Sequence, residues 1–472
     1  MRELKLSIGG QPHDGKPRTI KSPHDGRVVG EVHFGERAEI EAAMESARRA
    51  GPAMAALAPH RRAAILREMA AGLARRSDEN ARIISDEAGK PLRFARAEAE
   101  RAVDTFNEAA EQCRRLSGEY VGIDAVAAGH GRHGIVRRFP VGPVAGISPF
   151  NFPLNLAAHK VAPAIAAGCP MVLKPASQTP MSALVLAELA VEAGLPPGGL
   201  NVVPASREAA NLLTTDERMR LLTFTGSAEV GWAMKARAGK KRVVLELGGN
   251  AAALVGPDAD LAEAVPRLVT GAFAYAGQVC ISVQRIFVLD PLFDEFLSRF
   301  VEATRTLARV GDPADPDVVV GPMIDRANQE RVLEWIDEAR AAGARVCCGG
   351  EPRGTCVTPA VLTDVDPKLR ISAEEAFGPV VVVERVSGWD EAIARTNDSR
   401  FGLQCGVFTR DIKALWRCFE GIEVGGVIHD DFPTFRVDLM PYGGVKDSGF
   451  GREGPRYAIE EMSELRLLVL KP

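Results

Sequence analysis

The fold is decided by the stretch Leu221-Leu222-Thr223-Phe224-Thr225-Gly226-Ser227-Ala228-Glu229-Val230-Gly231. Its first five residues are apolar or β-branched and predict a buried strand, and a Gly-Ser pair then leads into a predicted helix. The first turn of a helix offers free N–H groups and the positive end of a dipole to an anion. We therefore expect a phosphate site that uses Gly226, Ser227 and Gly231. The spacing differs from the usual Gly-x-Gly-x-x-Gly fingerprint, and a plain capped helix would show the same pattern.

Strands and helices alternate on both sides of this stretch. Upstream, from Val141, we predict strands at 144–147, 171–173 and 201–203 and helices at 155–167, 182–193 and 207–213. Downstream, after Gly249, we predict helices at 260–275, 291–308, 325–342 and 389–395 and strands at 283–289, 379–385, 404–408 and 424–428. Such alternation predicts an α/β protein with parallel sheets covered on both faces. Sheets of this kind bind ligands at the carboxyl ends of their strands.

The segments outside the alternation have other patterns. Residues 1–36 predict short strands or irregular structure, whereas residues 37–115 predict helices, because apolar residues recur at intervals of three and four. The glycine-rich residues 118–140 predict an exposed β-structure. The terminal run Leu465–Leu470 is an apolar strand that would be sticky if left alone. We expect it to pair with residues 118–140 of this subunit or of a neighbouring one.

The composition is that of an ordinary globular protein. Of its 472 residues, 46% are hydrophobic and 25% are charged, with a formal net charge of −4. No basic patch indicates a nucleic-acid partner, and no apolar run reaches the length of a signal peptide core or of a membrane span of ~18 residues. The eight cysteines lack regular spacing, which favours a reducing, cytoplasmic location. Without a Cys-x-x-Cys or His-Glu-x-x-His motif, we predict no metal site.

A cysteine stands out in the stretch Ala276-Gly277-Gln278-Val279-Cys280-Ile281-Ser282. It follows a glycine-containing turn and precedes the predicted strand 283–289, so we expect its thiol at the end of a bend. Backbone N–H groups of a turn can lower the pKa of such a thiol and make it a nucleophile. A cysteine that acts only as a small buried hydrophobic residue would fit the same local pattern.

Three other polar side chains follow predicted strands. Glu246 ends an apolar strand just before two glycines, where desolvation would raise its pKa and suit it to general-base work, although a carboxylate that caps the strand is the alternative. Asn151 lies in the rigid loop Pro149–Pro153 and could donate a hydrogen bond to an oxyanion, or could be an ordinary turn residue. Lys174 could reach a ribose or a phosphate, or could be a solvated surface lysine.

Taken together, seven segments resemble the aldehyde dehydrogenase superfamily in order and spacing, over nearly the whole chain. They are Phe150–Pro153, Lys174–Ala176, Phe224–Ser227, Leu245–Gly249, Gly277–Cys280, Glu374–Pro379 and Pro441–Gly449. Within that superfamily, the chain looks most like the lactaldehyde and the non-phosphorylating glyceraldehyde-3-phosphate dehydrogenases.

The resemblance implies a subunit of three parts. These are a Rossmann-like cofactor domain (1–117 and 141–248), an α/β catalytic domain (249–450) and a small β oligomerisation arm (118–140 and 451–472). The arm would build a homodimer or a homotetramer. The implied reaction is the oxidation of an aldehyde to the carboxylic acid with NAD or NADP as the cofactor.

The resemblance also implies roles for individual residues. Cys280 would attack the aldehyde carbonyl, and the Asn151 side chain and the Cys280 N–H would hold the oxyanion. After hydride transfer to the nicotinamide, Glu246 would activate the water that hydrolyses the thioester. Glu375 and Phe377 match the family positions that hold the nicotinamide ribose and ring.

Two departures from the family pattern bear on specificity. Ser177 replaces a glutamate that many NAD-dependent members carry; this removes a repulsion to a 2′-phosphate, and Lys174 is placed to pair with that charge, so both NAD and NADP remain open. Val279 replaces an arginine that some members acting on anionic aldehydes carry. The remaining candidate anion contacts are Arg101, His159, Arg285 and Arg436, each of which could instead be solvated or ion-paired. A short, polar aldehyde is the expected substrate.

Two other functions are open to this chain. A CoA-acylating semialdehyde dehydrogenase would keep Cys280 but usually lacks the deacylating carboxylate, so Glu246 favours hydrolysis. A catalytically silent structural relative would have lost Cys280, Asn151 or Glu246, and all three are present.

Overall fold

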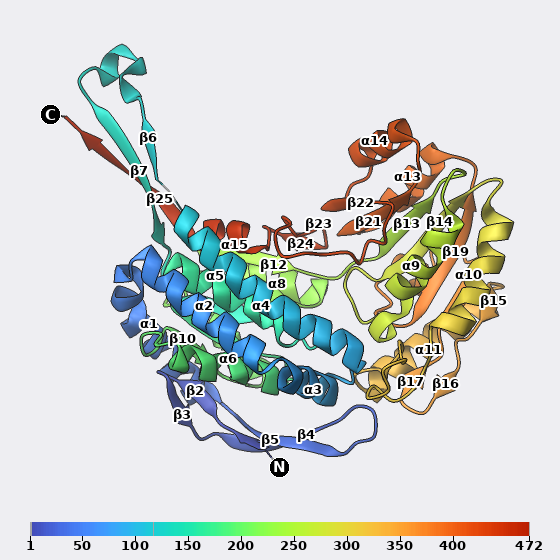
Figure 1. Cartoon of the computed structure of the whole chain (residues 1–472), viewed down its shortest axis with the longest axis horizontal. Helices are drawn as coiled ribbons and strands as arrows, with labels where there is room; N and C mark the ends of the chain where they lie inside the picture. The colour runs from blue at the N-terminus through green and yellow to red at the C-terminus, as the bar shows by residue number, and fades with distance from the viewer. Residues whose placement is uncertain (1, 117, 472) are drawn as a thin grey trace.

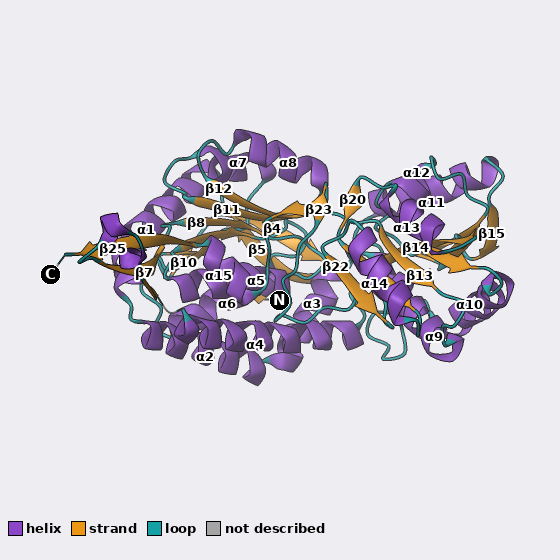
Figure 2. Cartoon of the chain, turned by 90° about the horizontal axis from the view of Figure 1, so that it is seen from above, coloured by secondary structure: helices purple, strands orange, loops and turns teal. Residues whose placement is uncertain are grey.

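The computed structural model describes residues 2–116 and 118–471. An eight-stranded sheet and a seven-stranded sheet form two lobes that lie side by side, and a thin β-hairpin with the C-terminal strand projects from the first lobe (Figure 1). Helices flank each sheet on both sides (Figure 2). The predicted α/β class is confirmed.

The first sheet has a parallel centre with antiparallel additions at both ends. In spatial order its strands are β24 (Gly449–Phe450), β12 (Arg242–Glu246), β11 (Leu221–Thr225), β8 (Val144–Ile147), β9 (Met171–Lys174), β10 (Leu200–Val202), β2 (Leu6–Ile8) and β3 (Gln11–His13). Strands β12 to β10 run parallel, while β24 and β2 pair antiparallel with their neighbours. The central strands are fully buried, which is why they lack polar alternation.

Two groups of helices cover this sheet. They are α1 (Arg37–Ala56), α2 (Pro59–Arg75), α3 (Ser77–Ala88), α4 (Leu92–Arg115), α5 (Asn155–Ala167), α6 (Met181–Glu192), α7 (Arg207–Thr215) and α8 (Ala228–Arg237). Helices α2, α4, α5 and α6 pack together on one side, and α7 and α8 lie on the other (Figure 2). Pro59 begins α2, and Gly89 ends α3 with a left-handed φ of 65°. Such a φ favours glycine, because a side chain would strain the backbone.

The second sheet consists of β15 (Arg345–Cys348), β18 (Ala360–Thr363), β19 (Val380–Val386), β14 (Val283–Leu289), β13 (Ala251–Val255), β21 (Gln404–Phe408) and β22 (Gly426–His429). All its neighbours pair parallel except β15 at the edge. The helices of this lobe are α9 (Leu261–Phe273), α10 (Phe293–Leu307), α11 (Arg326–Ala341), α12 (Arg370–Ala373), α13 (Trp389–Asn397) and α14 (Ile412–Gly421). Along β14, Ile286 and Val288 join the core formed with α9 and α10, whereas Phe287 and Leu289 join the core formed with α13 and α14.

The arm is a three-stranded sheet of β6 (Glu119–Val121), β7 (His133–Pro140) and β25 (Ser463–Leu470). Strand β25 pairs antiparallel with β7 along its whole length, so the expected pairing of the C-terminus with residues 118–140 is confirmed within one subunit. Two segments near the C-terminus pack on the first lobe, although one was expected in the catalytic domain and the other in the arm. Residues 449–450 join the first sheet as β24, and α15 (Pro455–Glu461) packs on α4 and α5, because its buried residues face that core.

The N-terminal strands β1 (Arg2–Leu4), β4 (Lys16–Lys21) and β5 (Val28–Phe34) form a separate small sheet at the bottom of the first lobe in Figure 1. Within residues 2–116 and 118–471, no helix has the length and apolar character needed to cross a membrane.

Candidate active site

The candidate site lies where the two sheets meet. Asn151, Lys174, Gly226 and Glu246 follow or end the parallel strands β8, β9, β11 and β12 of the first sheet. The second sheet contributes segments that precede its strands: Gly249 before β13, the cysteine turn before β14 and Glu375 before β19. The carboxyl ends of one sheet therefore face the amino ends of the other, which is where an open α/β sheet binds its ligands.

The cysteine lies in a tight bend, as the sequence predicts. A short 3₁₀ segment (Ala274–Gly277) contains Tyr275 and Ala276 in left-handed conformation, with φ near 53° and 54°. Gln278 is buried and holds this bend: its side-chain N–H groups donate to the carbonyls of Tyr275 and Pro322 at 3.3 and 3.2 Å, and its oxygen accepts the N–H of Ile324 at 2.8 Å. The backbone that carries the thiol is thus fixed by the Gln278 side chain, because both its amide nitrogen and its amide oxygen are hydrogen-bonded to backbone atoms.

The expectation that the turn lowers the pKa of Cys280 is wrong for the protein alone. Burial is the largest effect and raises the pKa of the Cys280 thiol to about 12, helped by the charges of Glu375 and Glu246. The hydrogen bond with Tyr442 and the charge of Arg436 act in the opposite direction but are smaller. Desolvation disfavours a thiolate more strongly than the turn favours it.

Asn151 and Glu246 both lie beside the cysteine bend. The Asn151 side chain is 4% exposed, and its Nδ2 donates to the carbonyl of Gln278 at 3.0 Å. An amide nitrogen has two N–H groups, so one remains for another acceptor. Glu246 is 3% exposed, and neither of its carboxyl oxygens has a hydrogen-bond partner within the described part of the chain. A Cβ at Gly443 would lie 2.9 Å from Glu246 Oε1, so the glycine leaves room for this carboxylate.

The electrostatic surroundings of Glu246 match the expectation from the sequence. Burial raises the pKa of Glu246 well above its ordinary value, and the nearby Glu453 adds to the shift. Arg436, Lys160 and Arg452 oppose it. A buried carboxylate without hydrogen bonds is costly to keep, which makes it a candidate for function rather than for structure.

Glu375 and Phe377 meet the same region from the side of the second sheet. Glu375 accepts the N–H of Gly249 at 2.9 Å, and burial raises its pKa to about 7. A Cβ at Gly248 would lie 2.3 Å from a Glu375 oxygen, so only glycine allows this approach. Phe377 packs edge-on against Phe150, with ring centroids 5.8 Å apart. Glu375 and Phe377 line a small pocket together with Gly249 and Val279.

The remaining predicted cofactor residues lie along the first sheet. Burial lowers the pKa of Lys174 to about 8, and the positive charge of Arg207 is a second, smaller cause. Ser177 donates its hydroxyl to the carbonyl of Ala205 at 3.3 Å. Ser227 is the N-cap of α8, but its side chain makes no capping hydrogen bond within that helix.

Two glycines of the predicted phosphate motif have packing reasons for their identity. A Cβ at Gly226 would lie 2.5 Å from the Phe224 ring, and one at Gly231 would lie 2.4 Å from Leu247. Both glycines let α8 lie close to the strands, whatever else they contact.

Three of the four candidate anion contacts gather in one group. Arg436 donates to Nδ1 of His159 at 3.1 Å and to Glu453 at 3.3 Å, and His159 Nε2 lies 2.7 Å from Asp438. Arg101 donates to the same carboxylate of Asp438 at 3.1 Å. Because Nδ1 accepts from Arg436, His159 is the neutral tautomer that donates from Nε2. Burial likewise lowers the pKa of His159.

Arg436 keeps unused donor capacity in this group. Its side chain is 7% exposed and its guanidinium lies 3.6 Å from the centroid of the Tyr442 ring. Among the described residues, the Nε atoms of Arg436 and of Arg101 are both buried without a hydrogen-bond partner. Arg285 does not join this group. Its guanidinium on β14 donates to the backbone carbonyls of Asn250, Arg395 and Thr396 and ties the second sheet to α13.

Several residues of the site were not singled out from the sequence. Tyr442 lies with its hydroxyl 3.0 Å from Cys280 Sγ, and Glu453 and Lys160 form a buried ion pair of 3.1 Å behind Glu246. Tyr442 lies within the motif Pro441–Gly449, and its polar hydroxyl is the feature of the sequence that could have marked it as a residue of the site. Lys160 and Glu453 are 293 positions apart, and no local pattern joins them.

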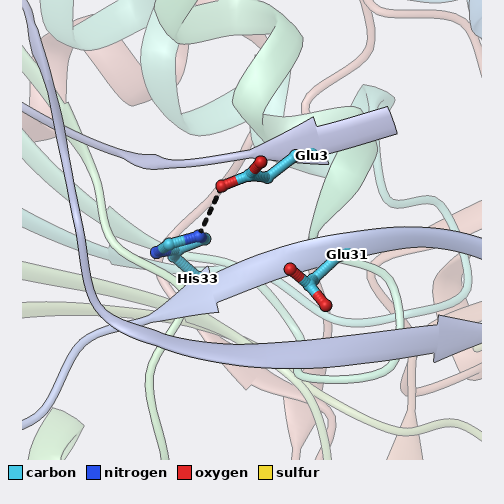
Figure 3. A group of neighbouring side chains, drawn as sticks. All are labelled: Glu3, Glu31 and His33. Atoms are coloured by element: carbon cyan, nitrogen blue, oxygen red, sulfur yellow. Dashed lines mark hydrogen bonds and ion pairs between the residues drawn. The ribbon is translucent and has the colours of Figure 1, made fainter. Parts of the chain in front are cut away.

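One cluster outside the site offers ligand atoms for a metal. Glu3, Glu31 and His33 come together where β1 and β5 pair side by side (Figure 3). The Gly15 N–H donates to His33 Nδ1 at 3.0 Å, so the ring proton sits on Nε2 and points at Glu3 at 3.0 Å. Neither ring nitrogen has a lone pair free for an ion, and the cluster is explained as a tie between strands.

Comparison with known proteins places this geometry in a family. The sequence model of the aldehyde dehydrogenase family matches residues 11–468. The 3-sulfolactaldehyde dehydrogenase of Priestia aryabhattai is 44% identical over 413 residues, which cover 87% of this chain and 86% of the relative. Succinate-semialdehyde dehydrogenase (NADP(+)) GabD of Escherichia coli (strain K12) is 39% identical over 466 residues, which cover 97% and 95%.

A solved structure gives the same answer for the fold. The crystal structure of aldehyde dehydrogenase 21 from Physcomitrella patens, in complex with the reaction product succinate, superposes with a TM-score of 0.97 at 44% identity and covers 99% of this chain and 98% of that one.

The chain belongs to the aldehyde dehydrogenase family. It is an enzyme that oxidises an aldehyde to the carboxylic acid with NAD or NADP, and the resemblance found in the sequence is confirmed.

Proposed function

We propose that this enzyme oxidises a short aldehyde that carries an anionic group, with Cys280 as the nucleophile. The observation that carries the proposal is the pair of guanidinium groups of Arg101 and Arg436, whose Nε atoms are both buried and unpartnered within the described residues. Arg436 packs on Tyr442, and the Tyr442 hydroxyl contacts the Cys280 sulfur. An anion bound by these guanidinium groups would thus have its carbonyl end near the thiol.

The residues divide the chemistry among them. The Cys280 sulfur attacks the carbonyl carbon, and the oxyanion of the thiohemiacetal accepts the second N–H of Asn151 and the backbone N–H of Cys280. The bound nicotinamide supplies the acceptor for the hydride. Glu246 then takes a proton from water, the water oxygen attacks the thioester carbonyl, and the carbon–sulfur bond breaks to release the acid and the thiolate. The free oxygens of Glu246 leave it able to turn toward that water.

The donor set fits a dinucleotide cofactor. The Ser227 hydroxyl lies at the positive end of α8 and makes no capping hydrogen bond there, which suits a pyrophosphate. Glu375 presents a carboxyl group that can accept from ribose hydroxyls, next to the ring of Phe377. Lys174 and Ser177 would face the adenosine ribose, and Arg207 adds a second positive charge there. We assign Gly226 and Gly231 to the close approach of α8 rather than to a direct contact.

The preference for an anionic substrate is tested with two aldehydes of equal chain length that differ in charge. Succinate semialdehyde ends in a carboxylate, and butanal has the same carbon chain without it. For the wild-type enzyme we expect a kcat/KM for succinate semialdehyde well above that for butanal. The Arg101→Met variant should lose about 10- to 100-fold in kcat/KM for the anionic aldehyde, because one hydrogen bond to a charged group is removed. Its kcat/KM for butanal should change less than about twofold.

The matched control is Arg96→Met, on the same helix. The Arg96 side chain is 51% exposed and pairs with Asp78. The same substitution there should therefore leave kcat/KM unchanged for both succinate semialdehyde and butanal. An equal loss for both aldehydes in Arg101→Met would contradict an anion contact. A dependence of the wild-type rate on CoA would contradict hydrolysis by Glu246.

We also propose that the arm joins subunits into a homodimer or a homotetramer in the cytoplasm. Leu465, Leu467 and Leu468 on β25 are more than half exposed, and strand β25 is an edge of its sheet. An apolar edge of this kind is normally covered by another chain. All eight cysteines are free, which fits a reducing compartment.

A further inference from the structure

Tyr442 is held rigidly against the nucleophile. Its side chain is 2% exposed, and its hydroxyl oxygen lies 3.0 Å from Cys280 Sγ. Its backbone exchanges two hydrogen bonds with Glu453, at 3.1 and 2.7 Å, and its ring is packed in an apolar cluster with Val279 and Ile281, which holds it in place. The contact between oxygen and sulfur therefore does not depend on a freely rotating side chain.

A positive charge lies against the face of this ring. The Arg436 guanidinium is 3.6 Å from the ring centroid and is itself held by His159 and Glu453. A cation over an aromatic face draws electron density from the ring, which makes the phenol a better hydrogen-bond donor. The charged groups that act on the thiol are thus Arg436, Glu375 and Glu246, and Tyr442 is the group in direct contact with it.

We propose that the Tyr442 hydroxyl donates a hydrogen bond to the Cys280 thiolate and thereby stabilises and orients the attacking sulfur, with Arg436 strengthening the donor. A thiolate has no proton to give, so the hydroxyl is the only donor that this contact can have in the reactive state. Burial raises the pKa of Tyr442 well above its ordinary value, so the hydroxyl keeps its proton at neutral pH. This inference rests on Cys280 being the nucleophile.

The test is the alkylation rate of Cys280 by iodoacetamide, an uncharged reagent, in protein without cofactor. The rate is followed between pH 7 and pH 9 by mass spectrometry of the peptide that carries Cys280. In Tyr442→Phe the thiolate fraction should fall about tenfold, since a hydrogen bond to a charged group is lost. A more basic thiolate is about threefold more nucleophilic, so the observed rate should fall about threefold at each pH.

The matched control is Tyr275→Phe. Tyr275 is equally buried in the same apolar cluster, but its hydroxyl donates to the Ala88 carbonyl at 3.1 Å and not to sulfur. Its alkylation rate should equal that of the wild type. A second variant carries 3-fluorotyrosine at position 442. Its more acidic hydroxyl is a stronger donor, and alkylation at a given pH should become faster.

Two results would overturn the proposal. Unchanged or faster alkylation in Tyr442→Phe would mean that the hydroxyl is idle or accepts from the thiol. An equal slowing in Tyr275→Phe would mean that the effect is one of packing. If Tyr442→Phe fails to fold, the direction of the 3-fluorotyrosine effect decides. Turnover retained in Cys280→Ala would instead refute the nucleophile, and so separates failure of the proposed function from failure of this inference.

Discussion

Lys174 is the single residue that we propose to set the preference between NAD and NADP. Its ammonium is mostly withdrawn from water, and its pKa falls to about 8 because charge is disfavoured there and Arg207 is near. Below that pH the side chain is positive and can pair with a 2′-phosphate. Above it the lysine is neutral, and only a neutral hydrogen bond remains.

The free enzyme should therefore discriminate between NADP and NAD in a pH-dependent way. As the pH rises through about 8, the ratio of kcat/KM for NADP to that for NAD should fall by about tenfold, because a charge-assisted interaction is lost. In Lys174→Met the ratio should be low and flat across the same range. Initial rates with both cofactors from pH 6.5 to 9.5 provide the measurement, and a flat ratio in the wild type would exclude Lys174 from the 2′-phosphate site.

At the scale of elements, the sequence predicts the bounds of those strands and helices that local residue patterns determine. Strands 144–147, 221–225, 283–289 and 404–408 and helix 155–167 have the predicted bounds, because each is a buried run bordered by turn residues. The edge strand β15, its buried neighbour β18 and helix α14 were not predicted. The residues of β15 are partly exposed, and α14 carries Trp416 and Phe419 on its solvent side, so neither shows a clear buried face.

In the candidate site, too, features set by the local sequence could be predicted and features set by distant contacts could not. Cys280, Asn151 and Glu246 could be predicted because each sits in a distinctive turn or strand end. Three features could not be predicted: the upward shift of the Cys280 pKa, the neutral state of His159 and the structural role of Arg285. They depend largely on contacts with residues more than 100 positions away, such as Tyr442 for Cys280, Asp438 for His159 and Arg395 for Arg285. Burial and pairing over such separations are properties of the folded chain alone.

The arm is the element that makes the clearest prediction about assembly. Leu467→Glu places a charge on the exposed face of β25, and each leucine buried between subunits contributes on the order of 1 kcal/mol at half exposure. We expect the variant to shift toward smaller species in light scattering after size-exclusion chromatography. Leu307→Glu, at an exposed leucine at the end of α10, should leave the mass unchanged. A monomeric wild type, or equal masses for wild type and Leu467→Glu, would contradict the role of the arm.

At the scale of the whole molecule, one segment near the C-terminus joins the two sheets. Strand β23 (Val445–Lys446) pairs with β20 (Phe401–Gly402) on the side of the second lobe, and β24 pairs with β12 of the first. The same segment supplies Arg436, Tyr442 and Glu453 to the site. The two lobes are therefore connected by the residues that surround Cys280, so the candidate site lies at the junction and not inside either lobe.

The central claim is that Cys280 carries the acyl group that Glu246 releases. The Glu246→Gln variant is mixed with succinate semialdehyde and NADP, quenched in acid, and digested for mass spectrometry. We predict a burst of reduced cofactor of about one equivalent per site without steady turnover, because the base for deacylation is lost. The peptide containing Cys280 should gain the mass of the aldehyde less two hydrogen atoms. Steady turnover with an unmodified Cys280 peptide would contradict the account.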